Sequence, residues 1–114
     1  MYTNFEKEKD ITSLTTFGIP TKARLFADYS SIKELTAISR TPEFTDNEVL
    51  HIGGGSNLLF VNDFNGLVLH SSIKGIVRYE KNEDTVYAIA GASEKWSDFV
   101  EWCISQGLGG VENL

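Results

Sequence analysis

"HIGGGSNLLF", His51 to Phe60, places three consecutive glycines between two apolar runs. The preceding "VLHI" (Val49 to Ile52) is typical of a short strand, so the glycines follow its carboxyl end, where open α/β sheets bind ligands. Glycine has no Cβ, so backbone N–H groups can come close to a bound group and together form a concave anion site. The stretch therefore predicts a phosphate- or pyrophosphate-binding loop built from Gly53, Gly54 and Gly55, with polar groups added at its rim by Ser56 and Asn57.

A tight turn that needs glycine only for its backbone is the alternative interpretation, and the residues alone leave both open. Two familiar nucleotide loops can be excluded directly. A Rossmann G-x-G-x-x-G needs glycine at position 58, and a Walker A loop needs it there followed by lysine, whereas this chain has Leu58 and Leu59. A phosphate loop here must be of another kind, in which the loop's own amides hold the anion.

Composition sets the class of protein. The 114 residues, 41% of them hydrophobic, fit a compact globular domain. Ten basic against 16 acidic residues give a net charge of −6 with no basic block, so nucleic acid is not an expected partner. A single cysteine, a charged amino terminus and the lack of any apolar run of about 20 residues predict a cytoplasmic protein with no membrane contact.

The first half of the sequence predicts a parallel βαβ unit. Residues 1–16 are polar and are expected to form an arm over the rest. A strand is predicted over Ala23 to Tyr29, then a helix that ends before Pro42, a polar loop over 41–48 and the strand at 49–52. Ser31 and Glu34 have the spacing of a capping box at the start of the helix.

The second half predicts three strands, partly antiparallel, followed by a helix. A strand is expected over 66–71, and two more over 75–80 and 85–91 have hairpin spacing around the turn "KNED". Apolar residues then recur at helical spacing from Trp96 to Ile104, which predicts one buried face, and Gly107 should end the helix in a left-handed conformation. The fold class is therefore mixed α and β (α+β).

Four segments occur in the order and approximate spacing of one family: "TTFGI" (15–19), "HIGGGSNLLFVNDFNGLVLHSSIKGI" (51–76), "AGASEKWSDFV" (90–100) and "GLGGVENL" (107–114). From about Leu14 to its last residue, the sequence closely resembles the amino-terminal part of the UDP-N-acetylenolpyruvoylglucosamine reductase (UDP-N-acetylmuramate dehydrogenase) family of bacterial cell-wall, or peptidoglycan, synthesis. The glycine loop with its Ser-Asn pair is the most specific of these segments, and "GVENL" is nearly as specific.

The resemblance implies a two-lobed FAD-binding domain of the vanillyl-alcohol-oxidase (PCMH) type. Residues 1–114 would be its amino-terminal portion: the first lobe, with a small parallel βαβ sheet flanked by helices, and the start of the second, antiparallel lobe. Position by position, it implies that the FAD pyrophosphate is bound by Gly53, Gly54, Gly55, Ser56 and Asn57. The implied reaction is a flavin-dependent oxidoreduction in which NADPH reduces the flavin and hydride passes to the enolpyruvyl group of a nucleotide sugar, with a protein acid protonating the adjacent carbon.

The sequence departs from the family pattern at two positions. Thr15 stands where the family usually has asparagine, which weakens any role for that side chain. Ser93 replaces the glycine of the commoner "GAGE", a change that should stiffen the turn before the helix and could equally supply an N-cap.

The family's catalytic arginine, serine acid and glutamate all lie beyond "GVENL", so no catalytic residue is assigned here. The 114 residues alone are therefore expected to be inactive, to hold FAD weakly or not at all, and to self-associate through exposed apolar surface.

Other candidate residues favour structural roles. His51 and His70 lie in or beside short strands with no further ligands marked, so no metal site is predicted. Cys103 should pack as a small hydrophobe. Trp96 is predicted in the buried stripe with Trp102 beside it, and Asp98 and Glu101 on a solvated face, whereas Glu112 is left open between a flavin-loop role and a backbone-positioning one.

Two further function classes stay open beside the flavoenzyme lobe. The same loop could serve a nucleotide- or phosphate-binding module that does not use FAD. It could also be a simple turn in a structural or interaction domain. Stabilisation by FAD separates the flavoenzyme lobe from both.

Overall fold

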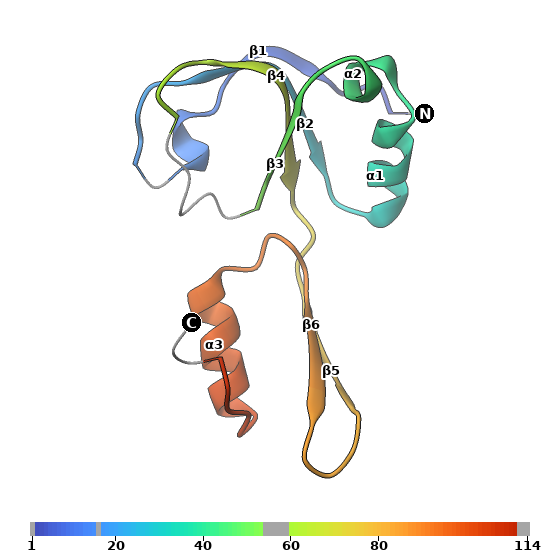
Figure 1. The fold of residues 1–114 in the computed structure, drawn as a ribbon, viewed down its shortest axis with the longest axis vertical. Helices are drawn as coiled ribbons and strands as arrows, with labels where there is room; N and C mark the ends of the chain where they lie inside the picture. The colour runs from blue at the N-terminus through green and yellow to red at the C-terminus, as the bar shows by residue number, and fades with distance from the viewer. Residues whose placement is uncertain (1, 16, 54–59, 112–114) are drawn as a thin grey trace. The chain divides into compact units, whose positions relative to one another are not determined.

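The computed structural model describes residues 2–15, 17–53 and 60–111 (Figure 1). The chain forms two compact units, Met1–Ser72 and Ile73–Leu114. The first contains a mixed four-stranded sheet and the second an antiparallel hairpin with a helix. The predicted mixture of α and β structure is confirmed, with parallel pairing in the first unit and antiparallel pairing in the second.

The sheet of the first unit has the strand order β1-β2-β4-β3. Its strands are β1 (Glu6–Asp10), β2 (Lys22–Tyr29), β3 (Val49–Ile52) and β4 (Phe64–Ser71). β4 pairs in parallel with both β2 and β3, whereas β1 runs antiparallel along the outer edge of β2.

The predicted βαβ unit exists, but its two strands are not neighbours. β2, α1 (Ile32–Ser39) and β3 follow one another, and β4 lies between the two strands. Strand β4 contains the run Leu67–Leu69, whose side chains are almost wholly buried. A continuous apolar run suits a central strand covered on both faces, which explains why β4 occupies this position.

The start of α1 confirms half of the predicted capping box. The Ser31 hydroxyl accepts a hydrogen bond from the Glu34 N–H at 3.1 Å. The Glu34 carboxylate, however, accepts from the N–H and the hydroxyl of Ser30, at 2.8 and 2.7 Å, and so reaches one residue further back than a capping box requires.

The segment predicted as a polar loop over 41–48 contains a short helix, α2 (Pro42–Thr45), so this prediction was wrong. Thr41 is its N-cap, with the Phe44 N–H donating to the threonine hydroxyl at 3.3 Å. Proline at the first helical position is favourable because its missing N–H would have no partner there.

Different segments cover the two faces of the sheet. Residues of α1 and α2 line a hollow together with Val49, His51 and Leu69, so the helices lie over this face (Figure 1). On the opposite face, Phe26, Ile52 and Val68 form a core cluster with Ile11, and Leu14 and Phe60 pack against it.

The amino-terminal residues form more than the arm that was predicted. β1 adds a strand to the sheet, and a 3₁₀ turn, η1 (Thr12–Leu14), follows it. The Tyr2 hydroxyl donates to the Asp28 carbonyl at 3.1 Å. The charged sequence "EKEKD" hid this strand, because a strand at the edge of a sheet can carry charges on its exposed side.

The second unit confirms the predicted hairpin and helix. β5 (Ile76–Glu80) and β6 (Val86–Ala90) pair in antiparallel register, and α3 (Trp96–Ser105) follows. Gly107 has φ +72°, the left-handed conformation expected just after the helix.

The predicted burial of the α3 stripe was wrong in part. Cys103 is only 3% exposed, but Trp96 is 48% and Ile104 61% exposed. Trp102, which was predicted to lie beside this stripe, is half-buried. The sheet that the structure describes in this unit has two strands, which is too narrow to cover a full helical face.

Candidate functional site

The carboxyl ends of three parallel strands define the candidate site. β2 ends at Tyr29, β4 at Ser71 and β3 at Ile52, with Tyr29 paired to Ser71 and Ile52 to His70. Gly53 is a half-buried bend residue directly after β3, and so it lies at the predicted end of this strand. The other predicted loop residues, Gly54, Gly55, Ser56 and Asn57, lie outside the described residues.

The described residues that follow β2 and β3 lie on opposite faces of the sheet. After β2 the chain enters α1, which lies on the face of Leu69. After β3 it comes to Phe60, which packs on the cluster of the other face. In open α/β sheets, ligands bind outside the carboxyl ends of strands at the point where the connections diverge in this way.

A hydrogen bond links β2 and β3 near this edge of the sheet. The Tyr29 hydroxyl bonds to Nε2 of His51, and the two rings lie 5.4 Å apart between centroids. Tyr29 is buried and His51 is exposed, two residues before Gly53. The contact fixes the end of β3, from which the glycine loop departs.

Asp28, His70 and Ser72 form a second polar cluster at this edge. The Ser72 hydroxyl donates to the Asp28 carboxylate at 2.7 and 2.9 Å, and His70 Nδ1 lies 3.4 Å from Asp28 Oδ1. A nucleophilic triad needs the histidine between the hydroxyl and the carboxylate. Here the carboxylate lies between them, so the cluster does not have the geometry of a hydrolase site.

Sequence reasoning missed Asp28, Tyr29 and Ser72. Their signal was their position at the ends of predicted strands, 23–29 and 66–71. The strand order needed to bring them to one edge cannot be derived from the strand positions alone.

Negative charge is present near this edge. The N–H and the hydroxyl of Ser30, just after β2, lower the pKa of Glu34 below its usual 4.5, so that this carboxylate is ionised at neutral pH. Asp28 adds a second carboxylate. An anion bound here would therefore depend on backbone N–H groups to offset the side-chain charge.

The two histidines serve different faces of the sheet. His51 lies opposite Leu69 in the strand register and hydrogen-bonds to Tyr29. His70 lies opposite Asp28 in the register, and its ring stacks on Phe26 with 6.3 Å between the ring centroids. Within 2–15, 17–53 and 60–111, no three His, Cys, Asp or Glu side chains come together as a metal-binding group.

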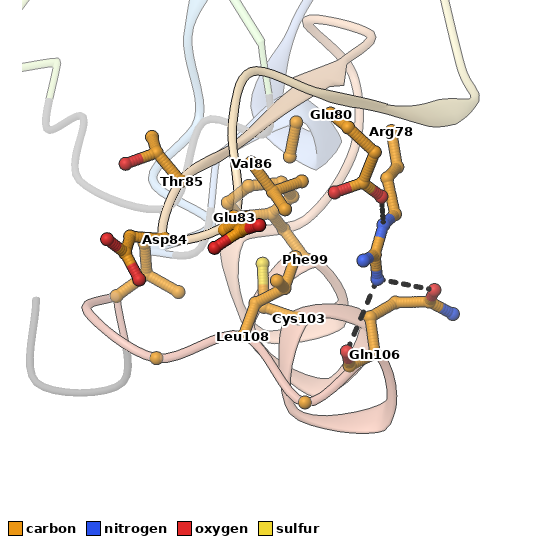
Figure 2. Close-up of a pocket in the computed structure, with 14 residues that line it drawn as sticks. Arg78, Glu80, Glu83, Asp84, Thr85, Val86, Phe99, Cys103, Gln106 and Leu108 are labelled. Atoms are coloured by element: carbon orange, nitrogen blue, oxygen red, sulfur yellow. Dashed lines mark hydrogen bonds and ion pairs between the residues drawn. The ribbon is translucent and has the colours of Figure 1, made fainter.

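The second unit has a hollow of about 580 Å³ between the hairpin and α3 (Figure 2). Arg78 donates to Glu80 at 2.8 Å and to the carbonyl and side-chain oxygens of Gln106, each at 3.3 Å (Figure 2). The acidic side chains lining the hollow are Glu80, Glu83 and Asp84. Three carboxylates against one guanidinium make this hollow unfavourable for a phosphate.

The remaining single-residue predictions have clear outcomes. Cys103 is buried among the residues that line this hollow, as predicted for a small hydrophobe. Asp98 and Glu101 are exposed, as predicted. Glu112 lies outside the described residues. No helix in the described part of the chain has the length and apolar character needed to span a membrane.

Comparison with known proteins supports the family resemblance. The chain is 40% identical over 109 residues to a UDP-N-acetylenolpyruvoylglucosamine reductase of Bacteroides fragilis, covering 96% of this chain and 32% of the relative. Reductases of the same name from Neisseria gonorrhoeae and Burkholderia mallei are 43% and 38% identical over 92% and 87% of this chain, and 30% and 28% of their own lengths. The chain thus spans about a third of the curated relatives that it matches. No family model matches it.

Proposed function

We propose that this chain is the amino-terminal portion, residues 1–114, of the FAD-binding domain of a UDP-N-acetylenolpyruvoylglucosamine reductase. Identities of 38–43% over most of the chain, to proteins that carry this name, support the assignment. A reductase of this name acts in making the nucleotide-sugar precursor of peptidoglycan, so the complete protein would be a cytoplasmic enzyme.

The loop that begins at Gly53 is the proposed binding site for the FAD pyrophosphate. The single observation that carries this proposal is the position of Gly53 at the carboxyl end of β3, where the connections after β2 and β3 diverge. Gly53, Gly54 and Gly55 would contribute backbone N–H groups, and Ser56 and Asn57 a hydroxyl and an amide. Backbone donors suit a site whose described side chains include two carboxylates.

FAD bound there would carry electrons from NADPH to the enolpyruvyl group of the nucleotide sugar. This chain's own contribution would be limited to binding and orientation. Tyr29 and His51 hold the end of β3 and so fix where the loop begins. No residue of the chain is assigned to proton transfer, and we expect the 114 residues alone to be inactive with NADPH and the nucleotide sugar.

A thermal melt tests cofactor binding by the chain itself. The 114 residues alone would hold FAD at best weakly, so we expect a rise in melting temperature only at high FAD concentration, because a ligand that binds only the folded state stabilises it in proportion to its occupancy. Gly54→Asp, which adds a carboxylate to the proposed pyrophosphate loop, should abolish this shift. Ser97→Asp adds the same charge in the first turn of α3 and should leave it unchanged.

Other ligands distinguish the flavin assignment from the second candidate function, a nucleotide- or phosphate-binding module that does not use FAD. The observation that favours it is the loop position itself, which suits any pyrophosphate. Stabilisation by ADP or inorganic pyrophosphate, with no added effect from FAD, would support it and count against the flavin assignment. NADPH-dependent reduction of the nucleotide sugar by the protein encoded by the complete gene would establish the reductase.

A further inference from the structure

The hollow of the second unit, about 580 Å³ between the hairpin and α3, has no role in the proposed function, because the proposed cofactor loop belongs to the first unit (Figure 2). Its volume lies within the range of roughly 300–1,000 Å³ that is usual for small-molecule sites. We propose that it binds a small organic ammonium ion with an apolar body, the ammonium at the hairpin turn and the body on the floor of the hollow. The proposal does not depend on the proposed function.

The hairpin turn supplies two carboxylates to the hollow. Glu83 and Asp84 line it, and neither forms an ion pair with any cationic side chain in the described part of the chain. The nearest lysine in the sequence, Lys81, holds its ammonium 5.3 Å from the centroid of the Tyr87 ring. Tyr87 points away from the hollow, because the residues on either side of it along the strand line the hollow. Lys81 therefore leaves the two carboxylates uncompensated.

The guanidinium that lines the hollow is already engaged. Arg78 donates to the Glu80 carboxylate at 2.8 Å and to two oxygens of Gln106 at 3.3 Å each. Figure 2 shows these three residues on one side of the hollow and Asp84 on the other. Arg78 and Glu80 together carry no net charge, so the charge that remains is that of the two carboxylates at the turn. Charge complementarity therefore favours a cation at this end of the hollow.

Hydrogen bonds fix the turn that carries the carboxylates. The N–H groups of Lys81 and Asn82 both donate to the Thr85 carbonyl, at 3.1 and 3.2 Å. The Asp84 N–H donates to the side-chain oxygen of Asn82 at 2.8 Å. Because the backbone of the turn is ordered before a ligand arrives, less conformational entropy is lost on binding.

The floor of the hollow is apolar. Cys103 lines it with a side chain that is only 3% exposed, and its thiol has no hydrogen-bond partner among the described residues. The other apolar residues that line the hollow are Val86, Ala88, Phe99, Leu108 and Val111. An apolar group laid on this floor would leave water while the ammonium meets the carboxylates. The hollow thus has the usual composition of a small-molecule site, with a mostly apolar lining and a few polar groups at one place.

An organic ammonium ion fits this arrangement better than a metal ion or an anion does. Its three N–H donors match the acceptor oxygens of Glu83 and Asp84. A metal ion would have no use for the apolar floor, and within 2–15, 17–53 and 60–111 no three side chains come together as a metal-binding group. An anion would be repelled by the uncompensated carboxylates.

NMR titration of the 114-residue chain with phenethylammonium tests the site. We expect saturable shifts of the amides of Val86, Ala88 and Leu108. Phenethyl alcohol, which has the same ring but no charge, should bind about two- to thirtyfold more weakly, the expected effect of losing two exposed ion pairs. 3-Phenylpropionate, with the opposite charge, should bind more weakly still. Raising NaCl from about 0.05 to about 0.5 M should weaken binding of the ammonium, because salt screens the carboxylates.

A matched pair of double variants tests the carboxylates. Glu83→Gln with Asp84→Asn should raise the Kd for phenethylammonium by about two- to thirtyfold. These positions lie in an exposed turn, so the fold should be kept. Asp98→Asn with Glu101→Gln removes the same charge from exposed positions of α3 that do not line the hollow, and it should change the Kd by less than about twofold.

The Cys103 thiol reports on the floor. Alkylation of this thiol by N-ethylmaleimide should slow as phenethylammonium saturates the site, because the ring would cover the floor. An unchanged rate at saturation would show that the probe does not bind there and would overturn the proposal.

Three further results would also overturn it: equal affinity for phenethylammonium and phenethyl alcohol, equal effects of the two double variants, or binding to the 114-residue chain that is lost in the protein encoded by the complete gene. The last result would show that the complete protein fills the hollow with its own residues. Retained binding in the complete protein, with the expected difference between the double variants, would support the site.

Discussion

The hydroxyl of Tyr29, at the end of β2, hydrogen-bonds to Nε2 of His51 near the end of β3, although β4 runs between the two strands. The tyrosine therefore reaches across β4, on which its paired residue, Ser71, is fully buried. One side-chain contact thus joins β2 and β3, and its histidine lies two residues before the proposed cofactor loop.

Tyr29→Phe should remove this contact without unfolding the chain. We expect the free energy of unfolding to fall by about 0.5–1.5 kcal/mol, the net value of one hydrogen bond. We also expect a smaller FAD-induced rise in melting temperature, because the loop would begin from a less fixed strand end. Chemical denaturation and the FAD melt measure the two effects. Tyr79→Phe, at an exposed tyrosine of the hairpin, should change neither.

Stability should decrease in acid through two carboxylates of the first unit. The hydroxyl and N–H of Thr12, at 2.6 and 2.9 Å, lower the pKa of Asp10 below 3.8, and Ser30 lowers that of Glu34 below 4.5. A lowered folded-state pKa gives stability that is present above the unfolded pKa and is lost as pH falls through the folded one. Melting temperatures should therefore drop below about pH 4.5.

Glu34→Gln isolates one of these groups. The variant should melt below the unmodified protein at neutral pH, and the difference should narrow as the pH falls through the lowered pKa of Glu34, where the carboxylate itself becomes neutral. A difference that stays constant over this range would show that ionised Glu34 does not contribute. Glu83→Gln, in the exposed hairpin turn, serves as the reference for a lost charge without these contacts.

Local sequence signals predicted the elements with strong patterns. β2, β3 and α3 begin or end within a residue or two of their predicted bounds, and the Ser31 cap and Gly107 were placed correctly. Each of these features depends on residues that are close in the sequence, such as a periodic run of apolar residues or a helix cap. Such features can be recognised from the local sequence alone.

Features that depend on distant partners were missed. Strand β1 is charged and exists because β2 offers a free edge. The exposure of Trp96 depends on the width of a sheet that the helix pattern cannot reveal. The same limit applies to the candidate site. The glycines predict a loop from local sequence, whereas the presence of Tyr29, Asp28 and Ser72 at the same edge follows from the strand order β2-β4-β3.

Gly91→Ala should destabilise the second unit selectively. The added methyl would overlap the Ile73 carbonyl, and relief of such overpacking costs about 1–3 kcal/mol. We expect faster hydrogen exchange throughout residues 73–111 and little change before Ser72. Gly18→Ala, where an added Cβ would meet nothing within 4 Å, should cost about 1 kcal/mol or less from its positive φ and affect the first unit instead. An equal response of both units to Gly91→Ala would contradict the prediction.

Self-association should occur through the outer face of the hairpin, which consists of Val77, Tyr79, Tyr87 and Ile89. These four side chains are 43–57% exposed, and the two tyrosine rings lie 5.1 Å apart between centroids. Neighbouring apolar side chains on an exposed face favour association in water. Sedimentation velocity should therefore detect species larger than the monomer as concentration rises.

A charge-pair variant tests this face while keeping the hairpin. Val77 and Ile89 are directly paired, so Val77→Lys combined with Ile89→Glu replaces an apolar cross-strand contact with one between opposite charges. The variant should stay monomeric at concentrations where the unmodified chain associates. Val61→Lys removes an exposed apolar side chain from the first unit and should leave association unchanged. Equal suppression by both variants would show that association does not depend specifically on the hairpin face.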